Sequence, residues 1–412
     1  MILTLAWRNV WRNSRRTLIN VVSIALGVWL TVTSVGLADY SYRQMIDDSA
    51  RMGLGHVTIQ PIDYLDAPSL KKTIAETATR QESIAAHRQT RAAATRITGQ
   101  AMFASASRSI GGSFLAIDPK QESRDINIFL RSLVEGEAFT NSEVRAVLVG
   151  EVLAKNLKLS VGRKLILTAV DRHGEVVSEL FRVCGIFRTG VVEIDGRMAV
   201  IPIERARQML HYAPDEATMI SVFVDDYRNA DVVRDLLATV IPRDAASVLT
   251  WRQTQPELAS LSDVDRGMNY LFLFLLGLLI AAGVLNTSLM SVLERRHEFG
   301  IMMAIGTRPG QLSAMILIEA ASMGFVGLLA GAILCVPWAY YLIAVGLDMS
   351  SVMGEDYTAA NVLIDPIWHI TLYPGRMFAI AAMLFTLTLI AALYPAFTAA
   401  RARPIESLRD AA

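Results

Sequence analysis

The sequence contains few of the residues on which metal sites and disulfide scaffolds depend. Of 412 residues only two are cysteines, Cys184 and Cys335, so a disulfide-rich fold is excluded. The six histidines are scattered along the chain without the spacing of a zinc site, and we predict no metal site. Charged residues make up 19% of the chain and hydrophobic residues 53%, against roughly 25% and 45–50% in soluble domains. This shortage of charge indicates that part of the chain lies in lipid.

Motifs of common enzymes are also missing. The sequence has no nucleophile elbow, no His-Glu-x-x-His pattern and no Gly-x-x-x-x-Gly-Lys-Ser/Thr phosphate loop. We therefore predict no catalytic residue and no cofactor bound by this chain, and we expect ATP and Mg²⁺ to be bound by a partner ATPase. Nothing in the sequence predicts a nucleic-acid partner. The glycine-rich sequence at Ser109–Ser113 is interpreted as a turn.

Long hydrophobic runs, by contrast, are abundant. A helix needs about 20 apolar residues to cross about 30 Å of hydrocarbon. Four segments are long enough: 17–38, 267–293, 309–347 and 377–400. The first is longer than the apolar core of a signal peptide, so it is interpreted as a membrane anchor although Gly36 and Ala38 resemble a cleavage site. Pro337 predicts a third span that ends near this proline and continues as a tilted or extramembrane extension.

The net charge of zero, with 39 basic and 39 acidic residues, conceals an asymmetry between the connecting segments. Ten arginines and four acids lie in the segments 1–16, 294–308 and 401–412, whereas the loop 348–376 has one arginine and four acids. Because basic residues favour the cytosolic side, both termini and the 294–308 loop are predicted to be cytosolic. Residues 39–266 then form one large extracytoplasmic domain of a multi-pass protein of the inner, or plasma, membrane.

Residues 1–16 have the pattern of an amphipathic helix. Leu3, Trp7 and Trp11 fall on one arc at helical spacing, and Arg8 and Arg12 fall on another. Such a helix is suited to the cytosolic headgroup region, either as a basic flank that only sets topology or as a lever that moves. Both interpretations remain open.

Stripes of small and polar residues run along two of the spans. They comprise Asn20, Ser23, Gly27, Thr31 and Ser34 in the first span, and Gly324, Gly327 and Gly331 in the third. Such stripes either let another helix approach closely or line a substrate cavity, and both interpretations remain open. Four helices are too few to enclose a pathway, so a second permease subunit, identical or different, is expected.

Glu319 is the only ionisable residue inside a predicted span. A carboxylate in lipid is costly unless it is paired or reaches water. The interpretation we favour is snorkelling or pairing with an arginine such as Arg308, and a proton relay is the alternative.

The external segment 39–266 alternates short apolar runs with helical patterns, which predicts a mixed α/β domain. Strands are expected at His56–Gln60, Phe114–Asp118, Ala146–Val149, Lys164–Val170, Leu180–Ile186, Met198–Pro202 and Met219–Val224, and helices at Glu151–Leu159, Glu204–Tyr212 and Asn229–Val240. The polar stretch 66–96 contains no strong strand and is expected to be a helix or an exposed arm. Asp171–Gly174 fits the turn of a hairpin.

The cytosolic segment 294–306, ERRHEFGIMMAIG, begins with charged residues and ends with small and apolar ones. A short amphipathic helix tethered at both ends is suited to seat in a groove of a cytosolic partner. This segment closely resembles the coupling segment of the FtsX/MacB-type family of ABC transporter permeases, which it matches at Arg295, Arg296, Glu298, Phe299, Gly300, Ala304, Ile305 and Gly306. The stretches 5–17 and 394–409 also resemble that family.

The resemblance implies a porter-like external subdomain with a second subdomain inserted at about 116–214. It also implies a permease that is moved by a cytosolic dimer of ABC ATPase subunits. With only 16 residues before the first span, we expect that ATPase to be a separate polypeptide. The stretches 133–139, 147–162 and 183–195 look like the lipoprotein-releasing (Lol-type) branch, which extracts lipoproteins from the inner membrane and passes them to a periplasmic protein.

Three functions compete at this point. The first is an ABC permease that releases lipoproteins toward the outer membrane. The second is MacB/FtsX-like mechanotransmission, in which the chain drives a periplasmic adaptor or a cell-wall hydrolase. Export of another amphiphilic substrate is considered together with it. The third, a membrane-anchored enzyme, is disfavoured because no catalytic constellation is found.

Overall fold

The computed structural model describes Arg8, Arg12 and residues 14–242, 245–349, 358–359, 362–363 and 367–401. Most of the predicted amphipathic helix 1–16 and of the tail 401–412 therefore lies outside the described residues. The described chain divides into two compact units. The membrane unit comprises the described residues of 1–40, 264–348 and 367–412, and the sheet unit comprises those of 41–263 and 349–366.

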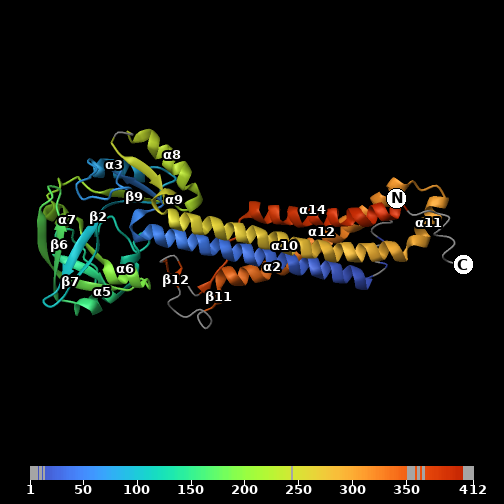
Figure 1. Ribbon diagram of the computed structural model, residues 1–412, viewed down its shortest axis with the longest axis horizontal. Coiled ribbons are helices and arrows are strands. Elements are labelled where there is room, and N and C mark those ends of the chain that lie inside the picture. The colour runs from blue at the N-terminus through green and yellow to red at the C-terminus, as the bar shows by residue number, and fades with distance from the viewer. Residues whose placement is uncertain are drawn as a thin grey trace. The chain divides into compact units, whose positions relative to one another are not determined.

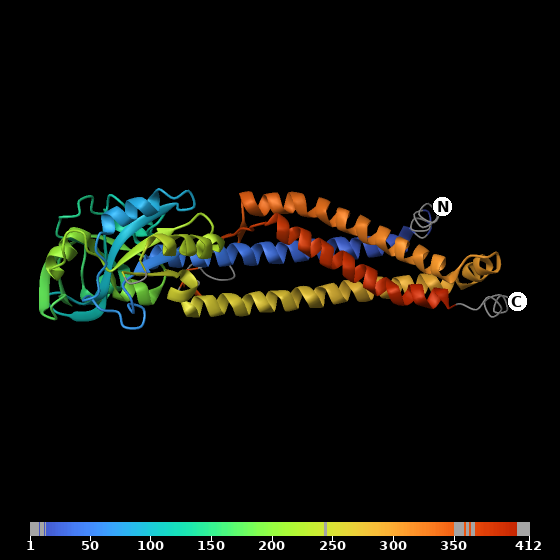
Figure 2. The same cartoon turned by 90° about the horizontal axis from the view of Figure 1, so that it is seen from above.

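Among the described residues, four helices are long and apolar enough to cross a membrane. They are α2 (Ser14–Ser49), α10 (Pro256–Glu294), α12 (Pro309–Ala344) and α14 (Pro374–Ala400), and they run side by side (Figures 1 and 2). Buried aliphatic side chains, including Ile24 of α2, Ile280 of α10 and Leu384 of α14, form their shared core. The prediction of four apolar membrane helices is confirmed.

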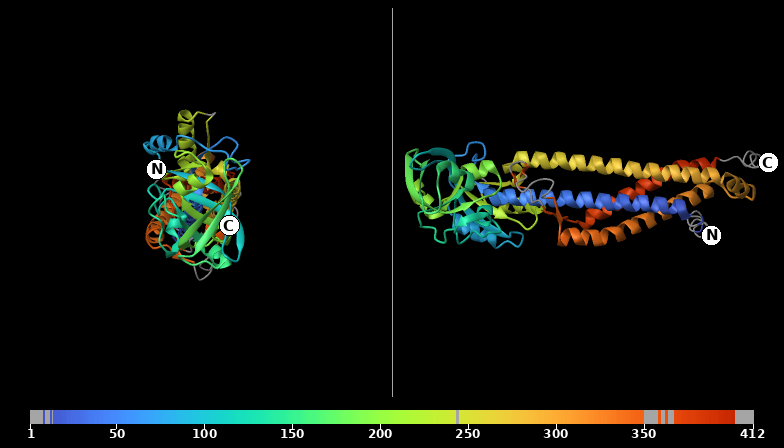
Figure 3. Two further views of the ribbon diagram at one scale, coloured as in Figure 1. Left: turned by 90° about the vertical axis from the view of Figure 1, so that its left-hand side faces the viewer. Right: turned by 90° about the horizontal axis from the view of Figure 1, so that it is seen from below.

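Helix α12 continues through Pro337 to Ala344, so the segment expected to extend beyond this proline is helical. That the span ends near Pro337 stays a prediction. Proline is tolerated inside membrane helices because neighbouring groups satisfy the backbone acceptor that loses its partner. Helix α14 packs along α12 in Figure 3. A short helix, α11 (Arg296–Ala304), connects α10 to α12, and β11 (Leu347–Asp348) pairs with β14 (Ile367–Trp368) beyond α12.

The sheet unit is built on ten strands in its described part. Their order is β10 (Ser247–Thr250), β1 (Val57–Gln60), β9 (Met219–Phe223), β2 (Ala92–Ala104), β3 (Ser109–Ile117), β8 (Met198–Pro202), β5 (Ala146–Gly150), β7 (Val176–Phe187) and β4 (Leu133–Gly136), and β6 (Lys164–Val170) pairs with both β2 and β7. Strands β3 and β8, and β5 and β7, are parallel, and the other pairs are antiparallel. Because β6 bonds to two strands, β2, β3, β8, β5, β7 and β6 close a ring.

Short helices cover this sheet. They are η1 (Ala50–Leu54), α3 (Thr77–Ala85), α4 (Ile128–Arg131), α5 (Glu151–Leu157), α6 (Val192–Arg197), α7 (Ile203–Leu210), η2 (Tyr227–Asn229), α8 (Ala230–Val240) and α9 (Trp251–Thr254). A separate two-stranded sheet is formed by β12 (Thr358–Ala359) and β13 (Val362–Leu363). Phe103, Phe114 and Phe181 are fully buried in the core of the ring, where Leu153 of α5 and Leu210 of α7 also pack.

Each predicted strand of the external domain lies within an observed one or overlaps it, and β6 and β8 have the predicted bounds. Two local expectations were wrong. Ser109–Ser113 is the first half of β3 and not a turn, and a strand, β2, begins at Ala92 inside the stretch expected to lack one. Asp171 N–H donates to the carbonyl of Glu175 and closes the predicted hairpin turn. The inserted subdomain at 116–214 stays a prediction.

A buried arginine ties η1 to the sheet. Arg96 of β2 is completely buried and pairs with Glu122, with Nε–Oε1 2.6 Å and Nη2–Oε2 2.8 Å. Its Nη1 donates to the carbonyl of Gly53 at 2.6 Å, and that carbonyl also accepts the hydroxyl hydrogen of Ser221. A buried charge is tolerated only when it is paired and hydrogen-bonded, and these contacts satisfy that requirement.

Candidate functional site

The segment between α10 and α12 forms a short helix with defined ends. Gly306 has a φ of 104°, a left-handed conformation that glycine adopts without strain. Its N–H donates to Met303 O at 3.1 Å and that of Thr307 donates to Met302 O at 3.0 Å, which is the Schellman pattern of a helix end. Pro309 then opens α12, where the Gln311 side chain accepts the Arg308 N–H. The segment is therefore a compact helix with a defined C-terminal end, directly followed by the start of α12.

A chain of alternating charges connects this helix to its neighbours in the membrane unit. Arg295 donates from Nε to Glu298 Oε2 at 3.0 Å and from Nη1 to Glu319 Oε1 at 3.1 Å. Arg12 donates from Nη2 to both Glu298 oxygens, at 2.9 and 3.0 Å. Arg12, α11 and α12 are thus linked through one arginine and two carboxylates.

The two ends of this ion-pair chain differ in exposure. The side chains of Arg295 and Glu319 are 10% and 12% exposed, whereas those of Arg12 and Glu298 are 48% and 47% exposed. Water and salt screen an exposed pair far more than a buried one. The inner pair is therefore the stronger mechanical link, and the outer pair is easier to break and remake.

The charge state of Glu298 follows from its partners. Partial burial alone raises the pKa of its carboxyl, but the hydrogen bonds from Arg12 and Arg295 outweigh that effect and lower the pKa below its usual value. Glu298 is consequently ionised at neutral pH, and the charge chain is fully formed there.

The inner side of α11 is held by packing. Phe299 is 1% exposed and lies in a cluster with Leu312 of α12 and Ala396 of α14. The Arg295 guanidinium lies 5.2 Å from the centre of the Phe299 ring, within the range of a cation–π contact. Displacement of α11 would therefore be transmitted to both helices.

The outer side of α11 exposes both aliphatic and charged side chains. Ile305 is 82% exposed and Ile301 is 41% exposed, and Arg296, His297 and Ala304 are exposed beside them. Gly300 is buried and Gly306 is exposed. Exposed aliphatic side chains rimmed by charge are typical of a protein-binding surface. We call Arg296, His297, Ile301, Ala304 and Ile305 the outer face of α11.

The glycine stripe of α12 faces neighbouring helices. A Cβ atom on Gly327 would lie 2.7 Å from Ile24, and one on Gly331 would lie 2.7 Å from Val28, both on α2. A Cβ on Gly324 would contact Thr388 of α14 at 3.3 Å. These three glycines therefore lie at helix contacts within this chain.

The stripe of α2 is less uniform. Gly27 lies against Ile280 of α10, and Asn20 is buried and donates from Nδ2 to Met323 Sδ at 3.8 Å. The remaining three range from buried Thr31 through half-buried Ser34 to exposed Ser23. The stripe therefore does not lie on one contact surface.

Sequence reasoning missed two connections in the charge chain. Glu319 pairs with Arg295 and not with Arg308, the partner named as an example. Arg12 was assigned to the charged arc of the N-terminal segment, without a link to Glu298. Both contacts join residues distant in sequence, and no local pattern reports them. Among the described residues, no cluster of histidine, cysteine or acidic side chains could hold a metal ion.

Comparison with known proteins adds the family context. Residues 17–240 match the MacB-like periplasmic core domain, and residues 270–404 match the FtsX-like permease C-terminal domain. The lipoprotein-releasing system transmembrane protein LolC of Neisseria meningitidis serogroup B is 25% identical over 95% of this chain and 94% of its own length. The macrolide export ATP-binding/permease protein MacB of Photorhabdus laumondii is 24% identical over 98% of this chain and 60% of its length. The crystal structure of the periplasmic region of MacB from Actinobacillus actinomycetemcomitans is 13% identical, with a TM-score of 0.37 over 54% of this chain and 96% of that one.

Proposed function

Because the chain belongs to the family of ABC transporter permeases with a MacB-like periplasmic core domain and an FtsX-like C-terminal domain, we propose that α11 couples it to a cytosolic ATPase. In this proposal the outer face of α11 seats in a groove of the ATPase. Movement of the ATPase displaces α11, and Arg295 passes the displacement to Glu319 and α12. The observation that supports this most is the position of Arg295 between Glu298 and Glu319.

The proposed assembly has two copies of the ATPase and a second permease subunit, identical or different. ATP and Mg²⁺ are bound by the ATPase, and the permease itself catalyses no reaction. In α10, 17% of the most apolar stretch is buried within this chain, against 44% in α2, so α10 has surface left for lipid or for the second subunit. Residues 294–308 can meet a cytosolic partner only if they face the cytosol, as the excess of arginine predicts.

For the substrate, we propose lipoproteins that are released from the inner membrane toward the outer membrane. This rests on a relative of nearly equal length that carries that function in its name. The second candidate is mechanotransmission to a periplasmic adaptor or hydrolase, or export of another amphiphile, and the similarity to a macrolide exporter favours it.

Two substitutions test docking and coupling separately. Ile305→Asp places a charge on the most exposed aliphatic side chain of the outer face of α11, so we expect roughly tenfold weaker capture of the ATPase that co-purifies with the wild-type chain. Glu298→Lys repels Arg12 and Arg295 but leaves Ile305 in place, so the ATPase should still bind while lipoprotein release falls at least about tenfold. Capture is measured by quantitative pull-down in mild detergent, and release by transfer of lipoprotein from proteoliposomes.

Val240→Asp serves as the matched control, because Val240 is also an exposed aliphatic side chain but lies in the sheet unit. It should leave ATPase capture unchanged. Normal capture by the Ile305 variant together with normal release by the Glu298 variant would disprove the assignment of α11. If ATPase coupling is intact but no lipoprotein is released by the wild-type protein, the substrate assignment fails and the coupling assignment survives.

A further inference from the structure

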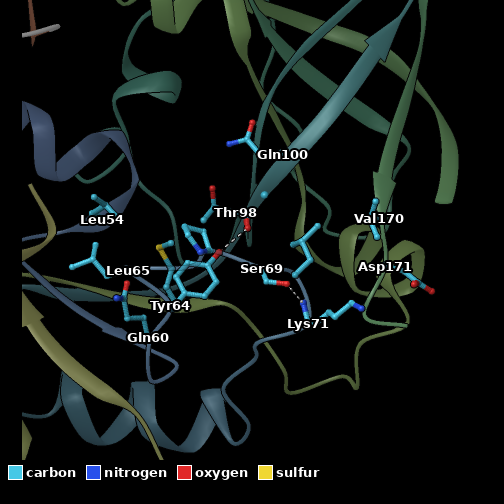
Figure 4. Close-up of a pocket in the computed structure, with 14 residues that line it drawn as sticks. Leu54, Gln60, Tyr64, Leu65, Ser69, Lys71, Thr98, Gln100, Val170 and Asp171 are labelled. Carbon is cyan, nitrogen blue, oxygen red and sulfur yellow. Dashed lines mark hydrogen bonds between the residues drawn. The ribbon is translucent and has the colours of Figure 1, made fainter. Parts of the chain in front are cut away.

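A cavity of about 350 Å³ lies in the sheet unit where β2 exchanges one neighbouring strand for another (Figure 4). Its walls come from β2, the loop of residues 64–71, the start of β9 and the end of β6. The volume falls in the range of about 300–1,000 Å³ that is typical of ligand sites. None of the functions considered above uses this cavity.

The cavity exposes a stretch of β2 that has no strand beside it. The edge of β2 that faces away from β3 pairs with β9 at Ala92–Arg96 and with β6 at Met102–Ala104. Between them, residues 97–101 have no strand partner on this edge in the described chain. Thr98 is satisfied by other groups, since its N–H donates to Thr218 Oγ1 at 2.9 Å and its carbonyl accepts from the Tyr64 hydroxyl at 3.2 Å. Alternate residues of a strand direct their peptide groups to the same side, so those of Gln100 also face the cavity.

The side walls of the cavity are mainly aliphatic. Leu65 and Val170 line it and are 44% and 47% exposed, so both offer aliphatic surface to a ligand. Met219 also lines the cavity and is buried, and Leu70 lies over Gly99, where any Cβ would be 2.7 Å from the leucine. The cavity can therefore bury aliphatic groups on both sides of an entering chain.

A lysine and an aspartate lie at one end of the cavity. Lys71 is exposed at the rim, beside the turn at Gly174. Asp171 lies at the same end, but its carboxylate already accepts hydrogen bonds from the backbone N–H groups of His173 and Glu175 and contacts His211 Nδ1. Lys71 is therefore the group at this end that would attract a carboxylate.

The loop that covers the cavity is held in place by its own bonds. Lys72 Nζ donates to the carbonyls of Asp63 at 2.6 Å and Ala67 at 3.2 Å, and the Tyr212 hydroxyl donates to the carbonyl of Leu70. A site that is already formed loses less conformational entropy when it binds a ligand.

We propose that this cavity binds a short extended peptide segment, with aliphatic side chains and a carboxylate placed near Lys71. The peptide adds beside β2 and exchanges main-chain hydrogen bonds with Gln100, in the manner of strand addition to an open sheet edge. A hydrocarbon chain would fill the same volume but would leave the peptide groups of Gln100 without partners, which costs free energy. This proposal goes beyond the proposed coupling function and does not depend on it.

Binding is tested with the full-length protein in nanodiscs and a fluorescein-labelled peptide, Gly-Val-Ile-Val-Asp with a free carboxyl end. Fluorescence anisotropy should show saturable binding. Val170→Glu should weaken it about tenfold or more, because it introduces a negative charge into the aliphatic wall. Val176→Glu is the matched control, since Val176 lies directly opposite Val170 in the same hairpin, is 73% exposed and does not line the cavity. It should leave binding unchanged.

Two further comparisons identify the chemistry. Lys71→Gln should weaken binding of this peptide several-fold. It should not weaken binding of a second peptide in which asparagine amide replaces the terminal aspartate, because that peptide has no carboxylate for Lys71 to attract. Replacing the central isoleucine by proline removes a backbone donor and should abolish binding. Equal binding of the proline peptide, or saturable binding of dodecanoate with no binding of the peptide, would overturn the proposal. ATPase capture through α11 is unaffected by either result, so this proposal and the proposed function can fail separately.

Discussion

Arg295 is the residue on which the charge chain depends. It pairs with Glu298 of α11 and with Glu319 of α12, and its guanidinium lies over the ring of Phe299. Because Arg295 and Glu319 are nearly buried, each needs the other to offset the loss of hydration. Removing only one of them takes a charged partner from the other in an environment of low polarity.

The expected result can be measured with single and double substitutions. Arg295→Met and Glu319→Leu should each lower the free energy of unfolding by on the order of 3 kcal/mol, whereas the double variant should be less destabilised than the two single changes together. Arg12→Met breaks an exposed pair and should cost about 1 kcal/mol or less. Chemical denaturation in one detergent measures all four variants, and strictly additive costs for Arg295 and Glu319 would contradict the pairing.

The short helix between the second and third spans could be predicted from sequence because its residues lie in one short motif. Charged residues followed by small and apolar ones are enough to mark 294–306 as an amphipathic helix between two spans. The partner of Glu319 could not be predicted in this way. Arg295 and Arg308 are both close to the cytosolic end of the spans, and only the packing of α11 against α12 determines which arginine reaches the carboxylate.

At the scale of the elements, close contact between α2 and α12 depends on glycine. A Cβ on Gly331 would lie 2.7 Å from the Val28 side chain and 3.2 Å from the Ala25 backbone, so Gly331→Ala requires the helices to separate. We expect a loss of about 1–3 kcal/mol in the free energy of unfolding. In Gly283→Ala nothing lies within 4 Å of the new methyl group, so this variant should be neutral or more stable by up to about 1 kcal/mol.

The comparison between these two variants separates helix packing from a substrate cavity. Thermal unfolding in mild detergent gives stability, and transfer of lipoprotein gives function. If Gly331→Ala keeps the stability of the wild-type protein and loses only transfer, the stripe of α12 lines a cavity and the packing interpretation is wrong.

Elements with a clear hydrophobic period were predictable, and those without one were not. Strand β6 alternates buried and exposed residues from Lys164 to Val170, and its bounds were predicted correctly. Strand β2 is rich in alanine, threonine and glycine, which have little side chain to show a period, and its identity depends on pairing with three other strands. The glycines of β3 indicated a turn, but Gly112 is required because a Cβ there would lie 2.1 Å from the carbonyl oxygen of Arg197.

At the scale of the whole molecule, the orientation in the membrane rests on the distribution of arginine. Three arginines lie in the 294–308 segment and one in the 348–376 loop, although the net charge of the chain is zero. The coupling proposal requires the cytosolic location that this bias predicts. An experiment that shows the opposite membrane orientation would therefore also exclude the proposed coupling of α11 to a cytosolic ATPase.

Reporter fusions test the orientation directly. Green fluorescent protein at the C-terminus should fluoresce, and alkaline phosphatase inserted at the β2–β3 turn, residues 105–108, should be active if that turn is external, as the arginine bias predicts. Replacing Arg295, Arg296 and Arg308 together by glutamate should lower both signals, since the segment would lose the positive charge that favours the cytosolic side. Replacing Arg172, Arg182 and Arg188 of the sheet unit by glutamate is the matched control and should leave orientation unchanged, because charges far from the ends of the spans contribute little. Phosphatase activity at the C-terminus of the wild-type protein would reverse the topology and exclude docking of a cytosolic ATPase on α11.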